Sequence, residues 1–214
     1  MKRIFTFLIF VFMLTACQDG HKKGYTYAEI ETDFGIIKVM LYNSTPVHRD
    51  NFIKLANEGF YDGLLFHRVK KAFMVQGGDP QSRNSPPGQR LGQGSPGYEL
   101  DPEIGAPHIK GALAAARTPN PQKKSSGSQF YIVQGVPIND DYLTQLEQQK
   151  GFQYNPEQKQ LYKELGGTPF LDGDYTVFGE VVEGIEIVDQ MSIVECDQFD
   201  RPVKDIQMKV RILK

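Results

Sequence analysis

Cysteine, tryptophan and an excess of charge of either sign are largely missing from this sequence of 214 residues. It has two cysteines and no tryptophan, and its 24 lysine and arginine residues nearly balance 26 aspartate and glutamate residues, which leaves a formal net charge of -2. Two cysteines cannot form the framework of a disulfide-rich domain. The sequence also lacks the basic footprint of a nucleic-acid-binding protein, so we expect no nucleic-acid partner.

Glycine, proline and long hydrophobic runs are too few for several other protein classes. The 21 glycines and 13 prolines together make up about 16% of the chain, below the level typical of collagen-like or disordered proteins. An apolar run covers residues 4–14 and contains a single polar residue, Thr6, but it is too short to span a bilayer. What remains is a globular protein with one large domain or two small ones.

Residues 1–17 resemble the signal sequence of a bacterial lipoprotein. Lys2 and Arg3 precede the apolar run, which ends in Leu14-Thr15-Ala16-Cys17, a pattern similar to the lipobox. The resemblance implies a signal peptide over residues 1–16, a lipid on Cys17 and a short tether up to residue 26. The protein would then be anchored to the membrane in the cell envelope on the extracytoplasmic side, either periplasmic or surface-exposed. An ordinary signal peptide with an incidental cysteine remains the alternative.

Residues 27–214 contain many short apolar segments, joined by connections rich in glycine and proline. Two helices are expected, one that begins at Thr45-Pro46, with Thr45 as its N-cap, and stops before Gly59, and one over residues 185–191. The pattern favours a mainly β domain, an antiparallel barrel or sandwich, over a doubly wound sheet. The predicted strands cover residues 27–32, 36–42, 64–69, 72–76, 111–116, 129–133, 176–182 and 206–213.

Residues 135–168 interrupt the strand pattern with helical sequence. Asp140 is expected to cap a helix that carries two leucines on one side. Asn155-Pro156 opens a second helix, which Gly166-Gly167 ends. We therefore predict an inserted helical hairpin with an apolar stripe. The stripe can overhang a functional site or pack on the barrel, and the sequence leaves both possibilities open.

Several common site motifs are absent or misplaced. Residues 92–97 match the glycine pattern of dinucleotide-binding turns, but no hydrophobic strand precedes them and Pro96 interrupts them, so we predict a surface loop. The four histidines show no ligand spacing, and the Gly-x-Ser-x-Gly elbow of serine hydrolases does not occur. We expect neither a metal nor a cofactor.

Four sequence blocks in a fixed order carry a specific resemblance to a known family. They are Phe66-His67-Arg68-Val69, residues 73–79 (FMVQGGD), residues 127–130 (GSQF) and residues 170–173 (FLDG). In this order they resemble the cyclophilin-type peptidyl-prolyl cis/trans isomerases, over roughly residues 27–213 apart from the insertion. The resemblance implies a closed, eight-stranded antiparallel β-barrel with two capping helices. It also implies proline-containing polypeptides as partners, and a closed barrel without exposed edges favours a monomer.

The reaction of that family makes a chemical demand that an arginine can meet. Rotation about a prolyl bond faces a barrier of ~18–20 kcal/mol, set by amide resonance. Twisting the amide localises the lone pair on its nitrogen, so a fixed donor aimed at that nitrogen stabilises the transition state more than the ground state. Arg68 is the candidate for this catalytic donor, and Gln76 is expected to hold it by a hydrogen bond. A dry, apolar pocket would grip the proline ring.

The resemblance also assigns the residues that bind the substrate. The proline pocket would consist of Phe73, Met74, Tyr131 and Leu171. Contacts to the substrate backbone are assigned to Gln76, Gln129 and the main chain near Ala116 and Arg117. Strand alternation places Gln129 and Tyr131 on one face and Phe130 on the opposite, core-facing side. Because Phe73 and Gln76 alternate to opposite faces, a bend is needed to bring both to one site.

The sequence departs from the family pattern at four of the expected site positions. Tyr131 stands where the family often has phenylalanine, so its hydroxyl needs a hydrogen-bond partner at the pocket wall. Phe170 replaces the tryptophan of cyclosporin-sensitive members, which argues against strong cyclosporin binding. Tyr175 and Arg117 replace a histidine and an asparagine. A scaffold that holds proline segments without catalysis is the alternative function, although such relatives usually lose the arginine that Arg68 retains.

Overall fold

Alternation of apolar and polar residues gives the chain one large antiparallel sheet. The computed structural model describes residues 24–213, and the predicted signal peptide (1–16) and lipidation site Cys17 lie outside them. A small separate sheet pairs β6 (Glu99–Leu100) with β8 (Ser125–Ser126). The strands of the large sheet, in spatial order, are β3 (Leu64–Leu65), β11 (Gln207–Ile212), β1 (Thr26–Thr32), β2 (Gly35–Leu41), β10 (Val177–Glu183), β7 (Ala112–Ala115), β9 (Phe130–Val133), β5 (Met74–Gly77) and β4 (Arg68–Lys70).

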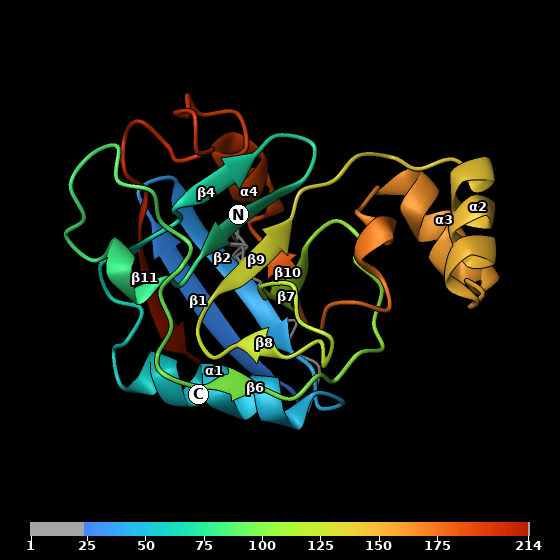
Figure 1. Cartoon of the computed structure of the whole chain (residues 1–214), viewed down its shortest axis with the longest axis horizontal. Helices are drawn as coiled ribbons and strands as arrows, with labels where there is room; N and C mark the ends of the chain where they lie inside the picture. The colour runs from blue at the N-terminus through green and yellow to red at the C-terminus, as the bar shows by residue number, and fades with distance from the viewer. Residues whose placement is uncertain (1–23, 214) are drawn as a thin grey trace, which may run out of the picture.

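The predicted closed barrel of eight strands is wrong. The predicted strand over residues 64–69 divides at Phe66-His67 into β3 and β4, which lie at opposite ends of the sheet order. Within residues 24–213 no ladder joins these two strands, because the N–H groups of Phe66 and Val69 donate to Ile206 and Asp200 instead. The fold is therefore a curled sheet of nine strands (Figure 1), whose two edge strands follow one another directly in the chain.

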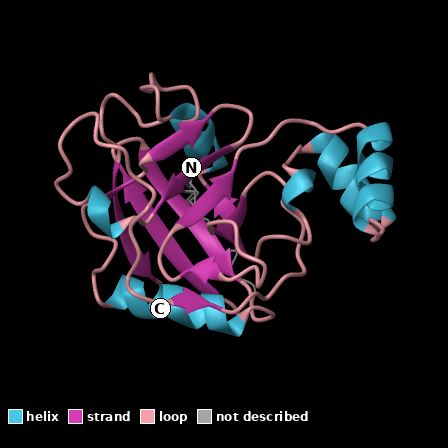
Figure 2. Cartoon of the chain, viewed as in Figure 1, coloured by secondary structure: helices cyan, strands magenta, loops and turns pink. Residues whose placement is uncertain are grey.

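Two helices cover opposite ends of the curled sheet, as predicted: α1 (Pro46–Asn57) and α4 (Ile185–Met191) (Figures 1 and 2). Thr45 is the N-cap of α1 by position, but its side chain makes no capping hydrogen bond. The cap comes from Glu103, whose carboxylate accepts hydrogen bonds from the N–H groups of Val47 at 3.1 Å and His48 at 3.0 Å. The start of α1 therefore depends on a residue far away in the sequence.

The predicted helical hairpin is present and stands beside the sheet, on the right in Figure 1. It consists of α2 (Asp140–Lys150) and α3 (Pro156–Glu164). Asn139, and not Asp140, caps α2, while Asn155 caps α3 as expected, with Gln158 completing a capping box. Within residues 24–213, no helix has the length and apolar character needed to cross a membrane.

The apolar stripe of the hairpin packs in a small cluster of its own. Its buried residues are Leu143, Tyr154 and Tyr162, with Ile109, Ile138 and Phe152 packed against them. Ile109 belongs to the segment that leads into β7, and a short 3-10 helix, η2 (Pro169–Leu171), follows the hairpin. The apolar stripe thus packs within the hairpin and against the segment that leads into β7.

The four neighbouring strands β10, β7, β9 and β5 each contribute side chains to two different apolar clusters. In β9, Phe130 and Ile132 lie in the main core with α1 and α4, whereas Tyr131 and Val133 belong to the cluster on the other face. Phe130 contacts three aromatic rings edge-on, including those of Phe52 and Tyr61, with centroids 5.6 Å away in both cases. The predicted opposition of Phe130 and Tyr131 is confirmed. The core anchors the strands, and the second cluster lies on the outer face.

His67 lies between β3 and β4, where it is 3% exposed and packs against Gly92. Burial lowers the pKa of His67 to about 4, although the nearby Asp79 carboxylate opposes the shift. In the unfolded chain His67 therefore becomes protonated below pH ~6.5, whereas in the folded chain it becomes protonated only when the pH approaches 4. The free energy of unfolding must fall as the pH falls through this window.

We expect this histidine to cost the protein about 3 kcal/mol of stability between pH 6.5 and pH 4, from a shift worth 1.36 kcal/mol per pKa unit. Urea unfolding at a series of pH values, compared with the variant His67→Gln, isolates the contribution, since the carboxylates titrate in both proteins. The variant should show a flatter profile in this window. Parallel profiles would contradict the assignment.

Candidate active site

The register of four neighbouring strands places several predicted site residues in one row on the outer face of the sheet. Arg68 of β4 is paired with Gln76 of β5, Gln76 with Tyr131 of β9, and Tyr131 with Ala114 of β7. Because paired residues of an antiparallel ladder lie on the same face, these four side chains are immediate neighbours. Side chains that lie up to 63 positions apart in the sequence, from Arg68 to Tyr131, are thereby brought together on one face of the sheet.

A cavity of about 90 Å³ opens beside this row. Phe73, one of its apolar walls, lies in a turn before β5, where Ala72 has a positive φ of 63° and the N–H of Phe73 donates to the Lys70 carbonyl at 3.1 Å. This turn supplies the bend that strand alternation required. The cavity is lined by Arg68, Phe73, Met74, Gln76, Ala116, Arg117, Tyr131, Leu171 and Tyr175.

Arg68 is held at the rim of the cavity by three neighbours. Its Nη1 donates to Gln76 Oε1 at 3.3 Å, the hydrogen bond that the sequence predicts. Its Nε donates to Asp200 Oδ2 at 3.4 Å, and its guanidinium carbon lies 5.8 Å from the centre of the Phe73 ring. The side chain is 37% exposed, so the charge remains partly solvated while its position is fixed.

Gln129 continues the polar row away from Arg68. Its Oε1 accepts a hydrogen bond from Gln76 Nε2 at 3.1 Å, and its Nε2 donates to the Gly94 carbonyl at 2.7 Å. Residues 92–97 form a loop, as predicted, and the Asp79 carboxylate accepts hydrogen bonds from the N–H groups of Gly92 and Gly94. This loop borders a second cavity of about 220 Å³, which shares Gln76, Ala116 and Arg117 with the first.

The Tyr131 hydroxyl finds the partner that its position requires. It lies 2.9 Å from His108 Nε2, and the two rings stack with an interplanar angle of 13°. His108 Nδ1 in turn lies 2.7 Å from Asp172 Oδ1. Burial raises the pKa of Tyr131 well above its ordinary value, so the hydroxyl stays protonated. The cavity wall therefore presents an aromatic ring with no unsatisfied polar atom.

Two further predicted residues occupy the side of the cavity next to the insertion. The guanidinium carbon of Arg117 lies 4.6 Å from the centre of the Tyr175 ring, and its Nε donates to the Asp174 carbonyl at 2.9 Å. Both side chains line the cavity. Arg117 thus places a positive charge over the Tyr175 ring.

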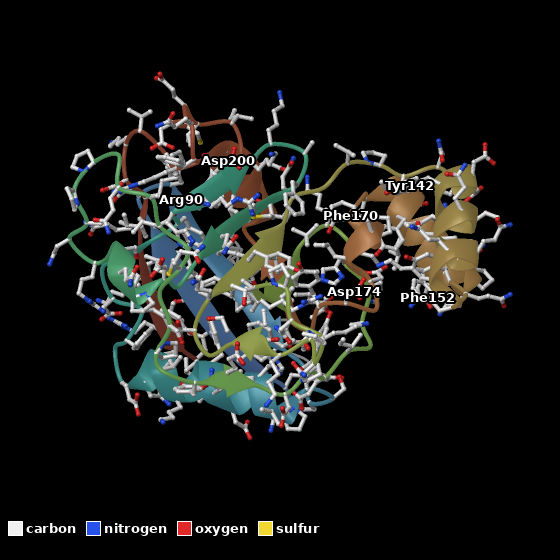
Figure 3. The ribbon with its side chains drawn as sticks, viewed as in Figure 1. Arg90, Tyr142, Phe152, Phe170, Asp174 and Asp200 are labelled. Atoms are coloured by element: carbon white, nitrogen blue, oxygen red, sulfur yellow. The ribbon has the colours of Figure 1, made fainter. Side chains whose placement is uncertain are left out.

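Phe170 and Ala116 complete the set of predicted site residues. Phe170 is 44% exposed and lies outside the cavity lining, with its ring 5.6 Å from that of Phe73 (Figure 3). The main chain of Ala116 is already paired, since its N–H donates to Gln129 and its carbonyl accepts from Ser126. Ala116 nevertheless lines both cavities, as Arg117 does.

Sequence reasoning missed three polar residues of the site. Asp200 lies 132 positions from Arg68 in the chain, and no local pattern connects them. Asp172 lies in the FLDG block of residues 170–173 but received no role of its own, and His108 lies outside all four blocks. The one usable signal was the tyrosine at position 131, because a hydroxyl in an apolar wall demands a buried partner.

Residues 27–212 match the family profile described as "Cyclophilin type peptidyl-prolyl cis-trans isomerase/CLD". The chain belongs to this family. A Staphylococcus aureus (strain USA300) protein named "Putative peptidyl-prolyl cis-trans isomerase" is 32% identical over 186 residues, which are 86% of this chain and 90% of that protein. A protein of the same name from Staphylococcus saprophyticus is 37% identical over 167 residues, 78% of this chain and 80% of that protein.

The fold is also that of a solved cyclophilin. A crystal structure of a cyclophilin-type peptidyl-prolyl cis-trans isomerase from Cryptosporidium parvum superimposes with a TM-score of 0.62 at 24% identity, over 89% of this chain and 98% of that chain. The protein is thus a cyclophilin-type peptidyl-prolyl cis-trans isomerase, with a curled antiparallel sheet and a helical insertion.

The contact between Arg68 and Asp200 gives this cyclophilin a measurable dependence on a distant loop. Replacing Asp200 with alanine leaves the guanidinium held by Gln76 and by the Phe73 ring. A partly exposed ion pair is worth about 0.5–1 kcal/mol, so we expect kcat/KM to fall about two- to five-fold. A prolyl isomerisation assay on a proline tetrapeptide measures this. Glu183→Ala, which removes the exposed pair with Lys38, is the control and should not change the rate.

Full activity in Asp200→Ala would show that Gln76 and Phe73 suffice to position Arg68. A loss as large as that of an arginine deletion would instead mean that the Asp200 charge itself matters in the reaction. Either result would contradict the proposed accessory role.

Proposed function

We propose that Arg68 accelerates prolyl isomerisation by stabilising the twisted amide. In the planar amide the nitrogen lone pair is delocalised and accepts hydrogen bonds poorly; in the twisted amide it is localised and accepts them well. A guanidinium held beside the proline ring therefore binds the transition state more strongly than either ground state. No bond is made or broken, so no nucleophile, acid or base is needed.

The position of Arg68 supports this proposal more than any other observation. It borders the same cavity as Phe73, Met74 and Tyr131, and Gln76 and Asp200 hold it from two sides. A donor fixed before the substrate arrives loses little conformational freedom on binding, which is the condition for efficient electrostatic stabilisation. The apolar walls exclude water that would otherwise stabilise the planar, dipolar amide.

The two cavities suggest how a polypeptide lies in the site. The smaller one accommodates the proline ring, and the larger one, bordered by the 92–97 loop, accommodates a neighbouring part of the chain. Gln76 and Arg117 line both, so each lies where it can contact the substrate backbone between them. A solved Cryptosporidium parvum cyclophilin was studied in the presence of the dipeptide Ala-Pro. We extend this to proline-containing polypeptides as the substrates of this chain.

The decisive experiment compares Arg68→Ala and Arg68→Lys with the parent protein in the isomerisation assay. Removing one preorganised donor of this kind typically costs about 100-fold in rate, and we expect that loss in kcat for Arg68→Ala. Arg68→Lys should recover only part of it, because an ammonium lacks the planar fork of the guanidinium. Peptide affinity should change much less than kcat.

Equal rates for the parent and Arg68→Ala would reject the arginine mechanism. A binding-only scaffold makes a different prediction: no isomerisation by the parent protein, with peptide binding retained. Glu183→Ala again serves as the control, since its side chain is exposed and lies outside both cavities.

We further propose that this enzyme acts on proteins outside the cytoplasm, from a lipid anchor on Cys17. The support is the sequence of residues 1–17, in which a basic start, an apolar run and a cysteine follow one another at lipobox spacing. A tether of residues 17–26 would span at most about 35 Å, so the catalytic domain would work close to the membrane.

The anchor can be tested with the full chain expressed in a bacterial host supplied with radiolabelled palmitate. The parent protein should incorporate the label and sediment with membranes, whereas Cys17→Ser should do neither. Cys196→Ser is the matched control, because it removes the other cysteine of the chain and should keep both properties. Label in Cys17→Ser, or its loss in Cys196→Ser, would contradict the assignment.

A further inference from the structure

A buried set of polar side chains connects the helical insertion to the wall of the smaller cavity. It runs from Tyr154 and Tyr162 through Asp172 and His108 to Tyr131, and we call these five residues the relay. All five side chains are buried, with exposed fractions between 0% and 7%. Two of them belong to the insertion, whereas Tyr131 lines the cavity. The relay therefore spans the whole distance from the insertion to the substrate site.

Asp172 is the centre of the relay. Its Oδ2 accepts hydrogen bonds from the hydroxyls of Tyr162 at 2.5 Å and Tyr154 at 2.8 Å. Its Oδ1 accepts from the backbone N–H of His108 at 2.8 Å and lies 2.7 Å from His108 Nδ1. The carboxylate thus has four partners, and half of them come from the insertion.

The two tyrosines of the insertion donate to Asp172, and His108 joins Asp172 to Tyr131. Burial raises the pKa of Tyr154 and of Tyr162, and the neighbouring Asp172 carboxylate raises both further, so the two hydroxyls stay protonated and donate. The His108 ring has its Nδ1 2.7 Å from Asp172 Oδ1 and its Nε2 2.9 Å from the Tyr131 hydroxyl. The orientation of the Tyr131 ring is thereby linked to the hydroxyls of the insertion.

Removing one side chain of the relay changes the hydrogen bonding of the others. A buried carboxylate is tolerated only when hydrogen bonds replace its hydration, so removing one donor forces the remaining partners to shift. The backbone around it leaves little slack. At Gly167, a Cβ would lie 2.3 Å from the His108 carbonyl oxygen and 2.6 Å from the Tyr162 ring. The main chain at Gly167 therefore packs tightly against both the Tyr162 ring and the His108 carbonyl.

Lys150, the last residue of α2, makes a second connection from the insertion to the cavity. Its Nζ donates to the carbonyls of Phe170 and Asp172, both at 2.7 Å, and to Asp174 Oδ2 at 2.8 Å. Leu171, which lines the cavity, lies between the two carbonyls in the chain. Figure 3 shows Phe170 and Asp174 in the space between the hairpin and the sheet.

We propose that the helical insertion is a positioning element for the proline cavity, which holds Tyr131 through the relay and Leu171 through Lys150. Tyr154, Tyr162 and Lys150 are positioning residues, since they lie outside the cavity lining and act on Tyr131 and Leu171 only through the residues between them. The inference depends on the proposed role of the smaller cavity as the proline site. It gives the insertion a part in substrate affinity although its own helices stand apart from the sheet.

The first test is Tyr162→Phe, which removes one hydroxyl and keeps the ring that packs in the hairpin cluster. One lost hydrogen bond in a relay of this kind corresponds to about a five-fold fall in kcat/KM on a proline tetrapeptide. The fall should reside in KM, because the cavity grips the proline ring in the ground state and the transition state alike, and Arg68 is untouched.

The second test places the same substitution in the Tyr131→Phe background, where the relay is cut at its cavity end. If the relay carries the effect, Tyr162→Phe should there change kcat/KM by less than about two-fold. Tyr142→Phe is the matched control, because Tyr142 lies on α2, is 38% exposed and is not part of the relay. It should leave kcat/KM unchanged in both backgrounds.

A thermal unfolding curve, recorded for each variant, shows whether that variant is folded at the temperature of the activity assay. A purely structural role of the insertion would lower the melting temperature of Tyr162→Phe and leave KM unchanged, and that result would overturn the proposal. Equal effects of Tyr162→Phe in the two backgrounds would overturn it as well. If Tyr162→Phe does not fold, Tyr154→Phe removes the other hydroxyl from the same carboxylate oxygen and takes its place, with the same criteria.

Lys150→Met tests the second connection independently, with Lys163→Met as its control on α3. We expect KM to rise for Lys150→Met and to stay unchanged for Lys163→Met. The experiments can reject the positioning role of the insertion and the arginine mechanism independently of each other. Loss of activity in Arg68→Ala without coupling between Tyr162 and Tyr131 would reject the positioning role only, whereas an active Arg68→Ala would reject the arginine mechanism and leave the coupling measurement valid.

Discussion

The hydrogen-bond register of β4, β5, β9 and β7 is the constraint on which the site depends. It aligns Arg68, Gln76, Tyr131 and Ala114 across the sheet. A slip by one residue would move every side chain of a strand to the opposite face. The main core prevents this, because Phe130 and its aromatic neighbours can be buried on one side only.

The same alternation explains why there is a cavity at all. On its inner face β7 carries Leu113, which fills the core, whereas on its outer face it carries Ala112 and Ala114. Ala116 belongs to the same outer cluster and lines the cavity together with Met74, Tyr131 and Leu171. Much of the apolar lining of the site thus comes from residues of the sheet and its immediate continuation.

Much of this arrangement could be predicted from the sequence. Local patterns gave most strands, both capping helices and the hairpin, and alternation correctly separated Phe130 from Tyr131. The closed barrel, which the family resemblance implied, was wrong because residues 64–69 divide into two strands, and the hydrogen bonds at the division come from Asp200 and Ile206. Asp200 beside Arg68 escaped prediction because this contact joins residues 132 positions apart, which leave no periodic signal. The contacts of Asp172 with Tyr154 and Tyr162 span only 18 and 10 residues, but the sequence left open where the apolar stripe of the hairpin packs.

The capping of α1 by Glu103 has a consequence for the local unfolding of the domain. The amides of Val47 and His48 are sealed by a carboxylate 55 or 56 residues away, since the local Thr45 side chain does not serve them. Whenever the segment that carries Glu103 detaches, the first turn of α1 loses its partners and frays. Local opening in two regions distant in sequence is therefore one cooperative event, which would expose the amides of both to solvent exchange together.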